Sequence, residues 1–239
     1  MDIEKSEWRL RPPLEPMTSL GAFVRDFVQR FPRERRDMVW DYCRTAPGLG
    51  EAITRACDSR TPDGKMHNHQ SRVTQAARDE FATIILTQTR KIRSIARGFR
   101  SGVAKEVYLD KMEREDGSLT YDSRFDELHD LFDDIKPYGI GPVTVYDVAT
   151  RVGAYLDIDP TSLYLHAGVR QGVQTLEWSM PSRVAPWSDV WKARRLTKEW
   201  LDKWWPEFDE VGLPPDEIED MLCTYRHAFM LLDEGADSQ

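Results

Sequence analysis

Residues 135–153 read IKPYGIGPVTVYDVATRVG and place a Gly-Ile-Gly turn directly before a predicted helix. Two glycines let a backbone adopt positive φ and come close to a ligand. Pro142 suits the first position of a helix, and Val145, Val148 and Ala149 supply small or apolar positions behind it. The N-terminus of such a helix points unsatisfied N–H groups at an anion. The stretch therefore predicts a backbone anion site, for which a DNA phosphate is the natural ligand.

The rest of the chain is dominated by helical patterns. Phe23, Phe27 and Phe31 recur every four residues behind a Ser19 cap, and Pro32 interrupts the run. Convincing alternation of apolar and polar residues is absent, so we expect an all-α protein. The expected helices cover residues 19–31, 34–45, 49–58, 73–99, 103–113, 123–135 and 142–153, a run that begins at 160, residues 188–204, and a last segment after 215 that reaches 232.

Composition narrows the class of protein. The chain has 239 residues, of which 40% are hydrophobic, and its eight Trp, eight Tyr and nine Phe are too many for a disordered chain. No run approaches the roughly 18 apolar residues of a membrane span, and the first residues lack the apolar run of a secretory signal. Cys43, Cys57 and Cys223 form no CxxC pair, which argues against a disulfide framework and against a cysteine-built zinc or iron–sulfur site. We expect a cytoplasmic protein.

The formal net charge of −8 argues at first against a nucleic-acid partner. The charges are segregated, however, because residues 81–105 contain six basic side chains and no acidic one, whereas residues 106–135 contain eleven acidic side chains and three basic ones. One DNA-facing surface on an acidic protein requires such segregation. An ordinary solvated helix face is the alternative. The basic residues are Arg90, Lys91, Arg93, Arg97, Arg100 and Lys105.

The stretch quoted first resembles a helix-hairpin-helix motif. Residues 123–135 would form the first helix, Tyr138-Gly139-Ile140-Gly141 the hairpin, and residues 142–153 the second helix. The alternative is a tight turn between two helices with no ligand. The apolar residue between the glycines, the flanking helices and the Gly-Pro-x-Thr opening together favour the motif.

Two further segments resemble the helix-hairpin-helix (HhH-GPD) superfamily of DNA glycosylases. EFATIILTQTRKIRSIARGF, residues 80–99, resembles the family's apolar helix that ends in a Gln-Thr pair, here Gln88-Thr89. AYLDIDPTSLYLHAGVRQG, residues 154–172, places Asp159 twenty residues after Gly139, where the family has its catalytic Asp at the start of a helix. The resemblance covers about residues 75–175, with the last helix as a further candidate, and implies a two-lobed helical fold of the DNA-glycosylase type.

The resemblance implies a DNA glycosylase that flips a damaged or modified base out of the duplex and hydrolyses its glycosidic bond. The Asp159 carboxylate would stabilise positive charge on the deoxyribose and orient the attacking water. Asp157 competes for this role, and simple helix capping is the alternative for Asp159. Family members that also cleave the strand carry a Lys where this chain has Val143, so we expect a monofunctional enzyme that leaves an abasic site.

The resemblance also implies the partners. We expect a monomer that binds double-stranded DNA and lies on the nucleoid when bound, with no membrane partner, no metal and no cofactor beyond a monovalent cation at the hairpin. Gln88 would lie near the gap left by the flipped base, and Tyr138 or Tyr164 would line the base pocket. The expected DNA-binding residues are Gln88, Thr89, Arg90, Arg93, Gly139, Ile140, Gly141, Val143, His166 and Arg170.

The chain departs from the family pattern after Asp159, where Pro-Thr-Ser replaces the usual Thr-His, and in a shorter segment between Gln88 and Gly139. A non-catalytic helix-hairpin-helix DNA-binding or repair-scaffold protein is therefore the second hypothesis, and a helical protein-interaction module is the third. His166 could equally be a satisfied polar residue.

The expected organisation is an extended arm over residues 1–16, helices and a loop over 17–70, the core over 71–175 with its hairpin at 138–141, and C-terminal helices over 176–239. His67 and His69 lie in the turn-forming loop 61–70 and have no adjacent carboxylate or Cys partner for a metal site. The tryptophans after residue 177 are spaced mainly for core packing, with a base-stacking wall as the alternative: Trp178, Trp187, Trp191, Trp200, Trp204 and Trp205.

Overall fold

A computed structural model of the chain describes residues 18–30, 33–60, 64, 73–97, 124–181 and 194–232, with only the backbone at 33–38 and 199. The described part is mostly helical, as the sequence predicts. It divides into two compact units, unit 1 with residues 1–33 and 162–239 and unit 2 with residues 34–161, so the expected core 71–175 contains parts of both. Several expected features lie outside the described residues: the arm 1–16, the loop 61–70 apart from Gly64, the helix 103–113, and Arg100, Lys105, Trp187 and Trp191.

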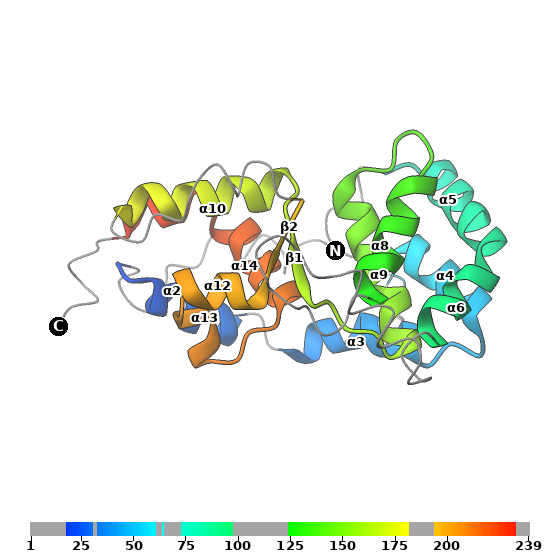
Figure 1. Cartoon of the computed structure of the whole chain (residues 1–239), viewed down its shortest axis with the longest axis horizontal. Coiled ribbons are helices and arrows are strands. Elements are labelled where there is room, and N and C mark those ends of the chain that lie inside the picture. Colours follow the sequence, from blue (N-terminus) through cyan, green and yellow to red (C-terminus); the bar gives the residue numbers. More distant parts are fainter. Residues whose placement is uncertain are drawn as a thin grey trace, which may run out of the picture. The chain divides into compact units, whose positions relative to one another are not determined.

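Unit 2 is built around α9 (Pro142–Leu156), whose buried face includes Val145, Val148 and Val152. This helix packs against α4 (Leu49–Asp58) and α8 (Arg124–Ile135), as Figure 1 shows in cyan and green. The remaining helices of this unit are α3 (Arg33–Arg44), α5 (Gln75–Thr87) and α6 (Thr89–Arg97).

The helix expected over residues 73–99 is divided at Gln88. Thr74 caps the start of α5 by accepting a hydrogen bond from the Ala77 amide at 3.2 Å. At the other end the Gln88 N–H donates to the Ile85 carbonyl at 2.8 Å, and the Gln88 carbonyl accepts from the Ile92 amide at 3.0 Å. This tightened turn ends α5 and starts α6. Apolar periodicity did not predict the break, because it runs through both helices without a Gly or Pro.

Unit 1 combines α2 (Leu20–Arg30) with elements from the second half of the chain. Ser19 caps α2 by accepting from the Ala22 amide at 3.1 Å, as its position predicts. The core of the unit joins the apolar stripe of α2 to residues of the later helices, including Trp205 and Phe208. Those later elements are α10 (Ala167–Ser179), α12 (Lys198–Trp204), α13 (Glu207–Glu210), α14 (Pro215–Tyr225) and the 3-10 turn η3 (Ala228–Leu231).

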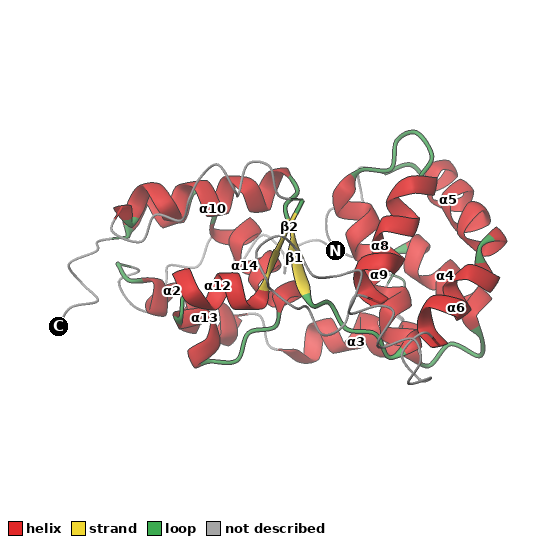
Figure 2. Cartoon of the chain, in the orientation of Figure 1, coloured by secondary structure: helices red, strands yellow, loops and turns green. Residues whose placement is uncertain are grey.

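Two short strands correct the expectation that strands are absent. β1 (Ser162–Tyr164) pairs antiparallel with β2 (Arg195–Thr197), with Leu163 opposite Leu196 (Figure 2, yellow). The helix expected from residue 160 therefore begins only at Ala167, and the one expected over 188–204 is helical only from Lys198 among its described residues. Each strand has only three residues and a distant partner, which local periodicity does not reveal.

The tryptophans of unit 1 largely follow the packing prediction. Trp205 is fully buried, and Trp200 and Trp204 pack against the same core, with 6.3 Å between their ring centroids. Trp178 differs, because 66% of its surface is exposed at the end of α10. Within the described ranges, no helix combines the length and the apolar character needed to cross a bilayer.

Candidate nucleic-acid interface

The helices on either side of the glycine turn have nearly the expected bounds, since α8 ends at Ile135 and α9 begins at Pro142. Gly139 lies at φ +91°, in the region that favours glycine. Ile140 between the glycines is buried at 5% exposure, and its amide donates to the Pro137 carbonyl at 3.3 Å. An apolar anchor therefore holds the turn against unit 2, while Gly139 is exposed and Gly141 is half-buried.

Gly141 is the N-cap of α9 and offers no side chain to the first-turn amides, of which Pro142 removes one. A Cβ atom built at Gly141 would meet nothing within 4 Å. The amides of Val143 and Thr144 come next along the turn, and Val143 is half-buried. The start of α9 thus combines uncapped backbone donors, a positive helix-dipole end and open space for an incoming anion.

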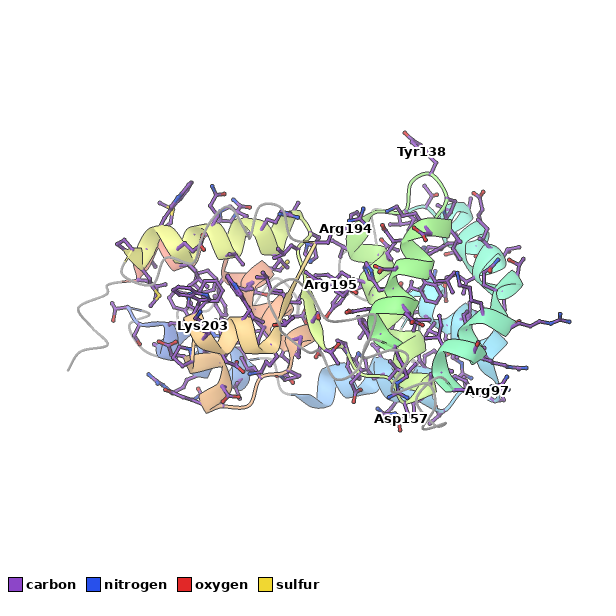
Figure 3. All side chains as sticks on the ribbon, viewed as in Figure 1. Arg97, Tyr138, Asp157, Arg194, Arg195 and Lys203 are labelled. Carbon is purple, nitrogen blue, oxygen red and sulfur yellow. The ribbon has the colours of Figure 1, made fainter. Side chains whose placement is uncertain are left out.

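Tyr138 occupies the tip of the hairpin. Its side chain is fully exposed, and Figure 3 shows it pointing away from the loop between α8 and α9. An aromatic ring in this position makes no contact that supports the protein core. It could stack on a base or on deoxyribose.

Charge around the hairpin is mixed. Lys136, which precedes the hairpin in the sequence, pairs through its ammonium group with the Asp133 carboxylate at the end of α8. The basic side chains of the described Gln88–Arg97 segment are all exposed on α6, and α6 packs against α8. These side chains are Arg90, Lys91, Arg93 and Arg97.

Gln88 and Thr89 lie at the junction of α5 and α6, both half-buried. The Gln88 Nε2 group donates to the Thr87 hydroxyl at 3.0 Å. Ala77, near the start of α5, lies against the hairpin, with its Cβ 3.9 Å from a Cβ built at Gly139. Eleven residues of helix, about 16 Å, separate Ala77 from Gln88, so Gln88 belongs to the end of α5 remote from the hairpin.

The two candidate carboxylates follow the C-terminus of α9. Asp157 is its C-cap at φ +59°, and the Ile158 amide donates to the Gly153 carbonyl at 2.9 Å. A Cβ atom at Gly153 would lie 2.5 Å from the Ile158 oxygen, so this close chain reversal requires glycine. Asp159 is exposed, and β1 follows it in place of the helix expected to begin at residue 160, so the alternative of helix capping does not apply.

The length of α9 separates these carboxylates from the hairpin. Fifteen residues at about 1.5 Å each make roughly 22 Å. In Figure 3 Tyr138 and Asp157 accordingly lie at opposite ends of unit 2. Most of the twenty residues between Gly139 and Asp159 thus belong to α9, and the hairpin and the Asp159 carboxylate do not meet at one site.

Tyr164, His166 and Arg170 belong to unit 1 and already have partners there. The Tyr164 hydroxyl accepts from Arg195 at 3.1 Å, and the Arg170 Nε group donates to the Leu165 carbonyl at 2.9 Å. His166 and Arg170 do not share a helix with Asp159, because α10 begins after His166 and does not include Asp159.

His166 instead lies beside two residues that the sequence analysis did not select, Glu219 and Cys223 of α14. Burial, with the nearby carboxylates of Glu219 and Asp220, raises the pKa of the Cys223 thiol well above its usual value. The spacing of Glu219 and Cys223 by one helical turn was the signal available in the sequence. Their partner His166 is more than fifty residues away and could be found only in the folded chain.

Comparisons of the chain with family models, with curated proteins and with solved structures find no match.

Proposed function

We propose that the chain binds duplex DNA through the hairpin at residues 138–141 of unit 2, as a helix-hairpin-helix protein. The supporting observation is the start of α9, where Gly141 provides no side-chain cap and has open space beside it, next to the positive-φ Gly139. A phosphate seated there accepts backbone hydrogen bonds and complements the helix dipole. The exposed basic side chains of α6 supply a second group of phosphate contacts in the same unit.

Gly141→Ala tests the hairpin sharply, because the added methyl group meets no protein atom within 4 Å but occupies the approach of a phosphate. Gly48→Ala is the matched control, since Gly48 is also an N-cap in unit 2 with nothing within 4 Å of its built Cβ. Loss of a hydrogen-bonded phosphate contact, worth about 1.5–3 kcal/mol, would weaken binding by roughly 10- to 100-fold.

The assay is fluorescence anisotropy of a labelled duplex over a range of salt concentrations. Gly141→Ala should lower affinity, and Arg93→Ala should reduce the slope of log K against log salt by about one. Gly48→Ala should match the wild type in both measurements. Equal affinity of the two glycine variants would remove the hairpin from the binding surface, and negligible wild-type affinity would favour a helical protein-interaction module.

Base excision is the second proposed function, in which the chain acts as a monofunctional glycosylase of the HhH-GPD type. Two observations support it. Gln88 lies at the junction of two helices, α5 and α6. The exposed Asp159 carboxylate follows the C-terminus of α9, where the Ile158 amide donates a hydrogen bond to the Gly153 carbonyl. A length of 22 Å corresponds to about six base-pair steps, so the duplex would have to extend from the hairpin along α9. Without an amine at Val143, the product is an abasic site with an intact strand.

Abasic-site formation in a panel of damaged and naturally modified duplexes measures this activity. Asp159→Asn should abolish excision and leave DNA binding unchanged. Asp157→Asn tests the rival assignment, because Asn tolerates the left-handed conformation at that C-cap, and it should excise at the wild-type rate if Asp159 is the catalytic group. If Asp159→Asn excises a base at the wild-type rate, the proposed chemistry fails. If the wild type binds DNA but excises nothing in the panel, a non-catalytic DNA-binding protein is the better description.

A further inference from the structure

Three side chains with metal-ligating atoms meet inside unit 1. His166 is the N-cap of α10, and Glu219 and Cys223 lie one turn apart on α14, so both of the latter project from one helix face. The ligand atoms of all three lie within 4.8 Å of one another. The His166 and Glu219 side chains are only 5% and 9% exposed.

The contacts among these side chains do not form a Cys-His-acid catalytic arrangement. The Glu219 Oε1 atom and the Cys223 Sγ atom both approach the same imidazole atom, Nε2, the sulfur at 3.7 Å. In a catalytic triad the carboxylate holds one ring nitrogen so that the other can accept the nucleophile's proton. The sulfur also lies 3.6 Å from the Glu219 oxygen. The three potential metal-ligand atoms, the imidazole nitrogen, the carboxylate oxygen and the sulfur, therefore all lie close to one another.

Two of the three separations agree with those of a tetrahedral zinc site, and the third is shorter. Zinc bonds of about 2.3 Å to sulfur and about 2.0 Å to nitrogen or oxygen place S and N, or S and O, about 3.5 Å apart. The observed values are 3.7 Å between Cys223 Sγ and His166 Nε2 and 3.6 Å between Cys223 Sγ and Glu219 Oε1. The closer His166–Glu219 contact would widen to about 3.3 Å as the ion replaces their hydrogen bond.

The close packing of α10 against α14 leaves room for the Cys223 sulfur atom. A Cβ atom at Gly168 would lie 2.7 Å from Cys223 Sγ, and one at Gly172 would lie 2.5 Å from the Leu222 carbonyl oxygen. Two glycines one turn apart on α10 therefore allow α14 to approach closely enough for Cys223 to reach His166. Any side chain at Gly168 would displace the thiol.

We propose that unit 1 binds one Zn²⁺ ion through His166 Nε2, a Glu219 carboxylate oxygen and Cys223 Sγ. Thiolate and imidazole ligands select zinc over Mg²⁺ and Ca²⁺, which prefer oxygen. The two anionic ligands balance the charge of the ion, and three protein ligands leave the fourth position to water. The ion links the start of α10 to α14. The site is independent of the hairpin and of any activity on DNA.

The first test uses the purified full-length chain after treatment with a chelator. Titration with Zn²⁺ followed by elemental analysis should give one bound ion per chain, and binding should raise the midpoint of thermal unfolding as Zn²⁺ increases. Co²⁺ in place of Zn²⁺ should give the thiolate-to-metal charge-transfer band and the intense visible bands of a tetrahedral site. Absence of stoichiometric Zn²⁺, or a Co²⁺ spectrum without the thiolate band, overturns the proposal.

Variants then assign the ligands. Cys223→Ser should remove the charge-transfer band. Cys223→Ser and Glu219→Gln should each weaken Zn²⁺ binding by at least roughly 10- to 100-fold, which is the loss expected even for a residue that only hydrogen-bonds to a metal ligand. Cys57→Ala is the matched control, because it removes a buried thiol from unit 2 and should bind Zn²⁺ as the wild type does. Loss of the thiolate band in Cys57→Ala instead would place the metal elsewhere. The wild-type Co²⁺ spectrum decides the question even if a ligand variant does not fold.

Discussion

Glu177 is a buried carboxyl group that stability measurements can detect. It lies on α10 with 2% of its surface exposed, and neither of its oxygens has a hydrogen-bond partner among the described residues. Burial raises the pKa of this carboxyl from 4.5 to about 7, because the charged form loses its hydration.

The raised pKa sets the sign of a pH dependence. Between about pH 4.5 and pH 7 the folded chain holds the Glu177 proton and the unfolded chain releases it, so the free energy of unfolding falls as the pH rises. At about 1.4 kcal/mol per pKa unit, the accumulated loss is about 3 kcal/mol, after which the curve levels off above pH 7. Below pH 4.5 the group is protonated in both states and contributes no pH dependence.

Glu177→Gln removes this titration and keeps the shape of the side chain. Relative to the wild type, the variant should gain about 3 kcal/mol of unfolding free energy between pH 4.5 and pH 8. Urea unfolding followed by tryptophan fluorescence is the assay, because every Trp except Trp40 belongs to unit 1. With a slope of about 1–3 kcal/mol per molar urea, the midpoint difference should grow by about 1–3 M.

Glu210→Gln is the control, since Glu210 is exposed in the same unit and should leave the pH dependence of the wild type unchanged. A difference between wild type and Glu177→Gln that stays constant from pH 4.5 to pH 8 would refute the reasoning. It would mean that the carboxyl group is solvated in the folded protein.

Three further substitutions test the packing inside each of the two units. Tyr225→Phe should destabilise unit 1 by about 1–3 kcal/mol in urea unfolding, because it leaves the buried Asp26 carboxylate without the hydroxyl that donates to it. Gly172→Ala should lower the thermal midpoint of unit 1, since overpacking against the Leu222 carbonyl costs about 1–3 kcal/mol; an unchanged midpoint would contradict the close approach of α10 and α14. Gly50→Ala should instead stabilise unit 2 by about 0.5–1 kcal/mol in urea unfolding followed by circular dichroism, because this helical position has room for a methyl group.

Local signals predicted the hairpin region well. The helix before it was expected over 123–135 and is found over Arg124–Ile135, and the next helix begins at Pro142 as expected. Glycine conformational freedom, proline at the first helical position and apolar spacing all act within a few residues. A single sequence therefore carries enough information for these elements.

Features that depend on distant residues were not predictable in this way. β1 is a strand because Ser162–Tyr164 finds its partner at Arg195–Thr197, and without that partner the same residues resemble the start of a helix. Likewise, the position of Asp159 in space depends on the length of α9, and the number of residues between Gly139 and Asp159 does not reveal it. The cluster of His166, Glu219 and Cys223 joins residues that are more than fifty positions apart.

Unit 2 lies in the sequence between the two segments of unit 1, so the two units become complete at different times during synthesis. Unit 2 is one continuous segment, so it can complete its core once the ribosome has passed Thr161. Among the described residues, the core cluster that contains Phe23 and Phe27 of α2 takes its members outside α2 from Leu163 onward, and these are translated later. At about 5–20 residues per second the apolar stripe of α2 stays without these partners for on the order of ten seconds. The apolar face of α2 therefore lacks these core partners for as long as the middle segment of the chain is being made.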